Sequence, residues 1–154
     1  MKKILSTVLT LLIWTNSAVA LDISDTEAIN RIIQHFSYVW NNQNGHGIAD
    51  NYAQDATFVS HIGMFVTGRD EIEIKHQLLQ NLLIGSIFEV SDMHLREIQP
   101  GVVIAHVFWN VSNIQGQGKA YFSENMKGIF THVFLKKDEK WEIITSQNTI
   151  AMTK

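Results

Sequence analysis

The 154-residue sequence contains no cysteine and a single proline, Pro100. Without cysteine the chain can form no disulfide and can carry no lipidated N-terminal cysteine, so packing alone must hold the fold. Lysine and arginine are outnumbered by aspartate and glutamate, 12 against 15, and they form no basic run. Nucleic-acid binding is therefore not expected, because neutralising phosphates requires clustered positive charge.

The first 20 residues have the pattern of a secretory signal peptide. A basic start at Lys2 and Lys3 precedes a mostly apolar stretch from Ile4 to Trp14, and Ala18-Val19-Ala20 is a small-x-small cleavage site. We expect cleavage after Ala20 and a mature chain in the bacterial periplasm or outside the cell; a retained N-terminal anchor is the alternative. No later apolar stretch is long enough for a membrane span, so no membrane contact is expected after cleavage.

Removing residues 1–20, whose only charged residues are Lys2 and Lys3, leaves 134 residues and takes the formal charge from −3 to −5. This is the length of one ordinary domain, residues 21–154, and no linker or internal repeat divides it.

Three helices are expected in the first half of that domain. A capping box, Ser24 to Glu27, precedes a first helix whose apolar face comprises Ile29, Ile32, Ile33, Phe36 and Trp40. A short second helix is expected from Ile48 to Ala53. A third should begin after Gly68, with an apolar face of Ile72, Leu79, Leu82 and Leu83 that His76 shares through its spacing.

Strand patterns follow, and they predict an α+β fold. Short strands are expected at 57–61 and 65–67, and longer ones at 87–98, 102–112, 129–136 and 141–149. A change of apolar phase between Val90 and Met93 predicts a β-bulge. Helices first and long antiparallel strands after favour a strongly curved, mostly antiparallel sheet packed on about three helices, a cone-shaped barrel with an interior cavity.

Several residues together resemble the SnoaL-like group, including the SgcJ/EcaC-type proteins, of the nuclear-transport-factor-2-like superfamily with its ketosteroid-isomerase-like fold. The matching positions are Trp40-Asn41, Asn44, Tyr52-Ala53-x-Asp55-Ala56-x-Phe58, Gly63, Gly68-Arg69-x-x-Ile72, His76, Trp141-x-Ile143 and Gln147-Asn148-Thr149. The resemblance spans Thr26 to Thr149. It implies the cone-shaped fold, but it does not select a reaction, because this scaffold hosts isomerases, dehydratases, cyclases, hydrolases and binding modules.

The chain departs from the ketosteroid isomerases at two positions. Ser60 stands where their general base lies, and Phe36 falls near their oxyanion tyrosine. Serine is a poor base at neutral pH and phenylalanine cannot donate a hydrogen bond. Proton abstraction by that machinery is therefore not expected.

His76 is the first candidate for catalysis or binding, with Asn148, Gln147 and His61 behind it. The competing interpretation of His76 is a core histidine with a satisfied hydrogen bond. Alternation from Phe58 directs His61 away from the core, unless the strand bends before Gly63, in which case His61 lines the cavity mouth. Gln147 and Asn148 occupy opposite faces of the last strand. Trp40, Tyr52, Phe65, His76 and Trp109 are the expected ligand-binding residues if the core is hollow.

His106 and His132 are expected side by side on the outer sheet face, where aromatic neighbours would suit a homodimer interface. No metal-binding spacing appears among the seven histidines, so no metal is expected. The sequence has no Gly-rich phosphate loop, dinucleotide fingerprint or nucleophile elbow, and no cofactor is expected.

Three hypotheses remain open. The first is a protein that binds a small apolar or amphipathic molecule. The second is an acid/base enzyme of the isomerase, cyclase or hydrolase type in the same cavity. The third is a dimeric interaction module that uses an outer-face cluster of Phe108, Phe130 and Phe134.

Overall fold

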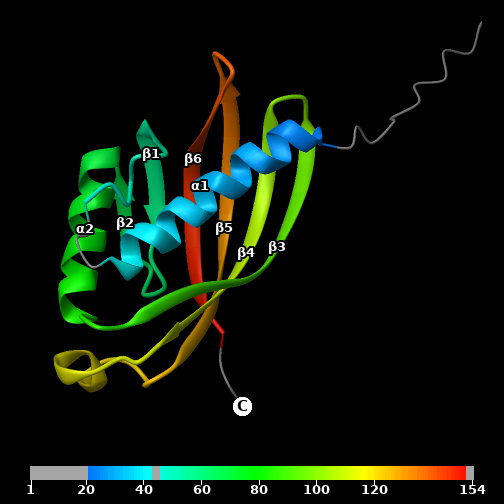
Figure 1. Cartoon of the computed structure of the whole chain (residues 1–154). Helices are drawn as coiled ribbons and strands as arrows, with labels where there is room; N and C mark the ends of the chain where they lie inside the picture. The colour runs from blue at the N-terminus through cyan, green and yellow to red at the C-terminus, as the bar shows by residue number, and fades with distance from the viewer. Residues whose placement is uncertain (1–20, 43–45, 152–154) are drawn as a thin grey trace, which may run out of the picture.

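The computed structural model describes residues 21–42 and 46–151. The chain forms α1 (Ile23–Asn41), β1 (Tyr52–Val59), β2 (Phe65–Thr67), α2 (Arg69–Leu82), β3 (Ile87–Gln99), β4 (Val102–Ser112), a 3-10 turn η1 (Gly116–Ala120), β5 (Met126–Lys137) and β6 (Lys140–Ile150). The six strands make one curved sheet in the order β2-β1-β6-β5-β4-β3, and α1 lies across it (Figure 1). The α+β architecture with a curved sheet is confirmed; the sheet is mixed and does not close into a barrel.

The first helix forms as its apolar spacing predicts, but it begins differently. Asp22 is the N-cap residue and Ser24 lies inside the helix, where its hydroxyl donates to Asp22 Oδ2 at 3.2 Å. The predicted capping box is therefore wrong. Farther along, Asp25 accepts hydrogen bonds from Trp141 Nε1 at 2.9 Å and Lys136 Nζ at 3.0 Å, which tie the start of α1 to the sheet.

The short helix expected from Ile48 to Ala53 does not form. Residues 46–51 make turns, and β1 begins at Tyr52, so two α-helices pack on the sheet instead of three. A segment this short gains too few helical hydrogen bonds to offset nucleation.

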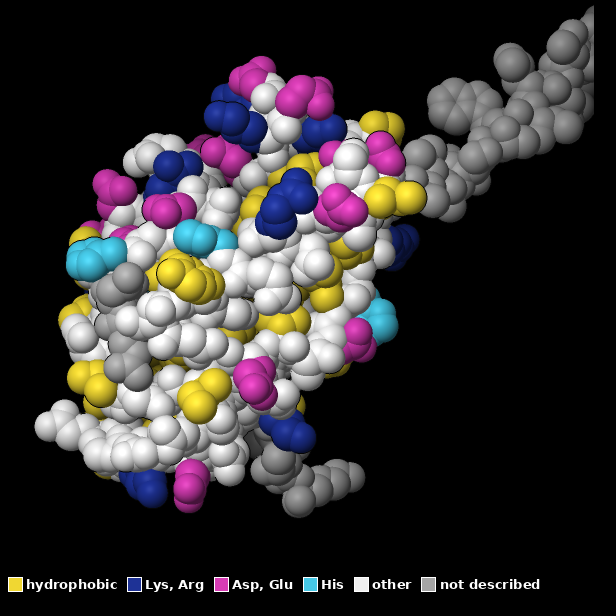
Figure 2. Space-filling model, in the orientation of Figure 1, with side chains coloured by type: hydrophobic (Ala, Val, Ile, Leu, Met, Phe, Trp, Pro, Cys, Tyr) yellow, Lys and Arg dark blue, Asp and Glu magenta, His cyan; other side chains and the backbone are white. Residues whose placement is uncertain are grey.

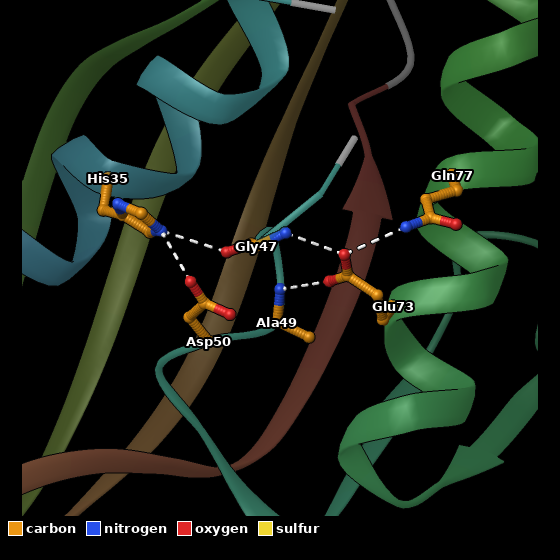
Figure 3. Close-up of polar contacts among 6 residues, drawn as sticks. All are labelled: His35, Gly47, Ala49, Asp50, Glu73 and Gln77. Carbon is orange, nitrogen blue, oxygen red and sulfur yellow. Dashed lines mark hydrogen bonds and ion pairs between the residues drawn. The ribbon is translucent and has the colours of Figure 1, made fainter. Parts of the chain in front are cut away.

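A polar clamp takes the place of that helix and joins the two real ones (Figure 3). The Glu73 carboxylate on α2 accepts the backbone N–H groups of Gly47 and Ala49, each at 2.8 Å, and the Gln77 side-chain amide at 3.0 Å. His35 on α1 donates to the Gly47 carbonyl at 3.0 Å. The clamp thus fixes α1 against α2, the two helices between which the site forms.

The bulge predicted in β3 is confirmed: its register against β4 shifts between Val90 and Asp92. The turn at Pro100-Gly101 is also present, with Gly101 at φ 79°. Bulges increase local twist and bend a strand. They therefore help to curve the sheet around the helices.

The inner face of the sheet is the buried one, and β4 supplies its most regular row: Val103, Ala105, Val107, Trp109 and Val111. Directly opposite residues of an antiparallel pair point to the same side. Register places Phe130, His132 and Phe134 of β5 opposite this row, so all three are buried inside.

The expectation that His132 neighbours His106 outside is therefore wrong, as is the outer cluster of Phe108, Phe130 and Phe134. His106 is exposed and contacts Thr131 instead. Among the described residues, no helix is long and apolar enough to span a membrane.

Candidate functional site

A cavity of about 530 Å³ lies between the two helices and the inner face of the sheet. Helix α1 contributes Phe36 and Trp40, and most of the other walls are apolar. The remaining lining residues are Phe58, Ser60, His61, Ile62, Met64, Lys75, His76, Leu79, Leu82, Leu83, Phe88, Trp109, Val111, Tyr121, Phe122, Met126, Phe130, Asn148 and Ile150. Cavities of this size and character are typical of small-ligand sites.

The aromatic wall is built from elements far apart in the sequence. Phe36 packs edge-on against Phe88 and Phe130, with ring centroids 5.1 and 5.6 Å away, and Phe88 stacks on Trp109 at 6.0 Å. Gly128 makes room for the Trp109 ring, because a Cβ at that position would overlap Trp109 Cζ2. The Trp109 side chain is therefore seated directly over the backbone of β5.

His76 is the buried polar group of the helical wall. Its Nδ1–H donates to the Ile72 carbonyl at 2.8 Å, and its ring meets Phe58 edge-on at 4.8 Å. Because a carbonyl only accepts, Nδ1 carries the proton and Nε2 keeps its lone pair. Among the described residues nothing bonds to that Nε2.

Burial lowers the pKa of His76, since desolvation of the imidazolium outweighs the favourable contributions of the Ile72 carbonyl and the Glu73 carboxylate. The ring is therefore neutral at physiological pH. A neutral imidazole in a fixed tautomer, with a free lone pair in a cavity wall, can accept a proton or a hydrogen bond from a ligand.

Asn148 supplies a second polar group on the sheet side. Its Oδ1 accepts a hydrogen bond from Trp109 Nε1 at 3.1 Å, which orients the amide and leaves Nδ2 as a donor. Asn148 and His76 thus line one cavity with complementary hydrogen-bonding capacity, a donor on β6 and an acceptor on α2.

The cavity opens between the loop after β1 and the segment after η1, where the exposed side chains of Ile62 and Tyr121 line its rim. His61 lines this mouth with its ring 5.7 Å from that of Phe122, and partial burial lowers its pKa. Alternation predicted that His61 points away, but β1 ends at Val59, so alternation does not extend to it.

Ser60, the residue at the isomerase base position, also lines the mouth. Its hydroxyl accepts the Met64 backbone N–H at 3.1 Å, and its backbone N–H bonds to the Met64 carbonyl at 2.9 Å. Phe36, near which the resemblance places the oxyanion tyrosine of the ketosteroid isomerases, lines the cavity without a polar group. Ser60 thus closes a turn, and neither side chain supplies an acid or a base.

The structure brings together Trp40, Trp109, His76, His61 and Asn148 among the residues proposed from sequence. The other three lie elsewhere. Phe65 is 66% exposed because its neighbour Val66 takes the inward position of β2. Gln147 is exposed on the outer face, as alternation with buried Ser146 requires. Tyr52 is fully buried and is not among the residues that line the cavity.

Tyr52 belongs to a buried polar chain that sequence reasoning did not find. Ser146 Oγ lies 3.1 Å from the Tyr52 hydroxyl and 2.6 Å from His132 Nδ1. Burial raises the pKa of Tyr52 to about 12, and burial together with repulsion from His76 lowers that of His132 to about 3. All three groups are therefore neutral at physiological pH.

Lys75 and Phe122 are further lining residues that the sequence pattern did not indicate. Helical spacing could have indicated Lys75 as a wall residue, because it lies four residues before Leu79 on α2, and residues four apart are neighbours on a helix surface. Phe122 lies in an irregular segment for which no periodicity applies. In the described part of the chain, no group of three or more histidine, aspartate or glutamate side chains is placed to hold a metal ion.

No family model matches the sequence. No curated protein matches it either.

Solved structures do match. A domain of unknown function with a cystatin-like fold from Nostoc punctiforme is 25% identical, covers 86% of this chain and 81% of its own, and has a TM-score of 0.73. An uncharacterized protein with a cystatin-like fold from Caulobacter vibrioides is 24% identical over 82% of this chain and 89% of its own, with a TM-score of 0.72. A proposed scytalone dehydratase from Novosphingobium aromaticivorans is 15% identical, covers 86% of this chain and 87% of its own, and has a TM-score of 0.68.

Further matches are described as proteins with the fold of nuclear transport factor 2, of unknown function. The resemblance drawn from the sequence is thus confirmed at the level of the superfamily's fold.

Proposed function

We propose that the protein binds a small, largely apolar or amphipathic molecule in the cavity between its helices and its sheet. The observation that carries this proposal is the cavity itself, about 530 Å³ of space walled by aromatic rings that pack on one another. A few oriented polar groups accompany them, chiefly His76 and Asn148. Such a cavity would gain hydrophobic free energy by exchanging water for an apolar ligand.

The protein acts, in this proposal, in the periplasm or outside the cell, after cleavage behind Ala20. The support is the basic, apolar and small-x-small sequence of residues 1–20, which lie outside the described residues. We further propose a homodimer formed through the outer face of the sheet. Half-buried Ile104, Phe108 and Ile129 on that face support an interface core, although the aromatic cluster expected there is absent.

Acid/base catalysis in the same cavity is the second candidate. The favouring observation is the fixed tautomer of His76, whose Nε2 lone pair is unshared within the described structure. One structural match is described as a proposed scytalone dehydratase, which supports considering catalysis on this fold. In this scheme His76 Nε2 removes a proton from the ligand, while the Asn148 amide donates to the oxygen on which charge develops.

Native mass spectrometry of the mature protein, purified without detergent, tests binding. We expect an adduct of a few hundred daltons that is lost on denaturation, and stabilisation of the stripped protein by apolar compounds in a thermal-shift screen. Absence of both an adduct and any stabilising compound would contradict the proposal.

Deuterium exchange tests the catalytic alternative without a known product. A bound hydrophobic cyclic ketone is incubated in D₂O, and its α-hydrogens are followed by NMR. If His76 acts as a base, exchange on the wild type exceeds that on His76→Gln at saturating ketone. Equal rates in the two proteins would reject His76 as the base while leaving binding intact.

A further inference from the structure

The cavity wall contains a lysine, Lys75, and binding of a purely apolar molecule gives its charge no role. Lys75 lines the cavity on α2, with His76 beside it and Leu79 one turn farther on. The residue is half-buried, so part of its side chain packs against the protein and part reaches solvent. Among the described lining residues none is an aspartate or glutamate, and Lys75 is the sole lysine or arginine.

Lys75 also lacks an ion-pair partner within the described chain. Among the described residues, the lysines and arginines that form salt bridges are Arg31, Arg69, Lys119 and Lys136, and none of these pairs includes Lys75. Glu71, one turn earlier on α2, is exposed and makes no ion pair with it. A lysine stem can lie along an apolar wall while its ammonium reaches water. The ammonium of Lys75 is thus available to a ligand.

The two histidines of the cavity do not change this charge balance. His61 and His76 are both neutral at pH 8, since each has a pKa below the ordinary 6.5. The cavity therefore combines an apolar interior with one fixed positive charge and no negative charge from the described lining residues. Its complement is a molecule with an apolar body and one anionic end.

We propose, building on the binding function above, that the cavity selects monoanionic amphiphiles whose carboxylate pairs with Lys75 while the apolar body fills the aromatic interior. A carboxylate accepts the ammonium donors as a charge-assisted hydrogen bond, which is stronger than a neutral one. Partial burial of Lys75 reduces the screening that weakens fully exposed pairs. An amine-headed amphiphile would instead meet like charge at the same position.

A matched ligand series on matched variants tests this inference. Decanoate, 1-decanol and decylamine share one chain and differ in charge, and their dissociation constants are measured at pH 8 below their aggregation concentrations. Lys75→Met keeps an unbranched apolar side chain and removes the charge, whereas Lys75→Arg keeps the charge. Lys137→Met is the control: Lys137 is the exposed last residue of β5, beside the β5–β6 turn, at the end of the molecule where charged side chains gather (Figure 2).

We expect Lys75→Met to weaken decanoate about ten-fold, a loss of about 1.4 kcal/mol of binding free energy. The same change should leave 1-decanol within about two-fold and should tighten decylamine. Lys75→Arg should retain decanoate, and Lys137→Met should alter none of the three. Circular dichroism melting of each variant shows that the fold is kept.

Each other outcome overturns a distinct claim. If decanoate and 1-decanol respond equally to Lys75→Met, the carboxylate inference fails while binding in the cavity stands. If the wild type binds none of the three compounds, both the inference and the binding proposal fail. If Lys137→Met weakens decanoate as much as Lys75→Met, the effect is one of net charge and the specific pair is rejected.

Discussion

The Nδ1 atom of His76 lies 2.8 Å from the carbonyl oxygen of Ile72, one helical turn earlier on α2. This contact determines the chemistry of the ring, because it places the proton on Nδ1 and leaves Nε2 as an acceptor. The two interpretations that the sequence left open for His76 are therefore compatible. One ring nitrogen is satisfied as in a core histidine, while the residue lines the cavity wall.

Acidification should destabilise the protein through its buried histidines. The folded-state pKa of His132 is about 3, against an unfolded value of about 6.5, so only the unfolded chain takes up this proton between those pH values. The contribution of neutral, buried His132 to the free energy of unfolding is complete above about pH 6.5 and is lost as the pH falls below that value. The loss is on the order of 3 kcal/mol at pH 4.

Urea unfolding from pH 7.5 to 4 measures this effect. His132→Gln, which has no ionisable group, should show a weaker pH dependence than the wild type. The exposed His94→Gln should behave as the wild type does. Parallel pH profiles for wild type and His132→Gln would contradict the assignment of the proton to His132.

Removal of the Glu73 carboxylate should loosen the clamp between α1 and α2. Glu73→Ala leaves the N–H groups of Gly47 and Ala49 without their acceptor, at a cost of about 1–3 kcal/mol in the free energy of unfolding. Glu71→Ala, two residues away and exposed, controls for loss of a negative charge near the helix N-terminus. Denaturant unfolding measures the free energy of unfolding of both variants. Equal losses in Glu73→Ala and Glu71→Ala would show that the clamp hydrogen bonds add nothing to stability.

Gly128→Ala should destabilise the wall of the cavity by about 1–3 kcal/mol, because its Cβ would overlap both the Trp109 ring and the backbone carbonyl oxygen of Thr149. The cost should be smaller in a Trp109→Leu background, where the ring is absent. Unfolding of the two single variants and the double variant gives the coupling between the positions. Full additivity would mean that the Trp109 ring is not what excludes a side chain at position 128.

The outer sheet face gives a prediction about assembly. Phe108→Glu places a charge beside Ile129, its cross-strand partner on the face proposed for dimerisation. The variant should be a monomer by light scattering while the wild type is a dimer, with unchanged circular dichroism. A wild type that is monomeric, or a Phe108→Glu variant that remains dimeric, would reject this face as the interface.

Much of the fold could be predicted from sequence because β4 and α2 carry strong periodicity. The apolar row from Val103 to Val111 defines one face without ambiguity, and the phase change before Met93 indicated the bulge. Alternation alone does not say which of two faces is buried. For β5 both rows are partly apolar, and only its pairing with β4 turns His132 inward.

The site was less predictable because its members converge through tertiary packing. Tyr52 carries an aromatic ring like Trp109, yet it is buried outside the cavity lining, where its hydroxyl bonds to Ser146. Phe65 sits in a three-residue strand, too short for alternation to set its direction. Lys75 belongs to the wall through helical spacing, but a surface lysine has the same sequence signature.

Filling the cavity tests the central claim most directly. Leu79 lines the cavity on α2, whereas its neighbour Leu78 is 59% exposed and is not among the lining residues. We predict that Leu79→Trp abolishes or weakens binding of 1-decanol at least ten-fold by isothermal titration calorimetry, while Leu78→Trp binds as the wild type does. Binding of 1-decanol by folded Leu79→Trp with wild-type affinity would contradict the account.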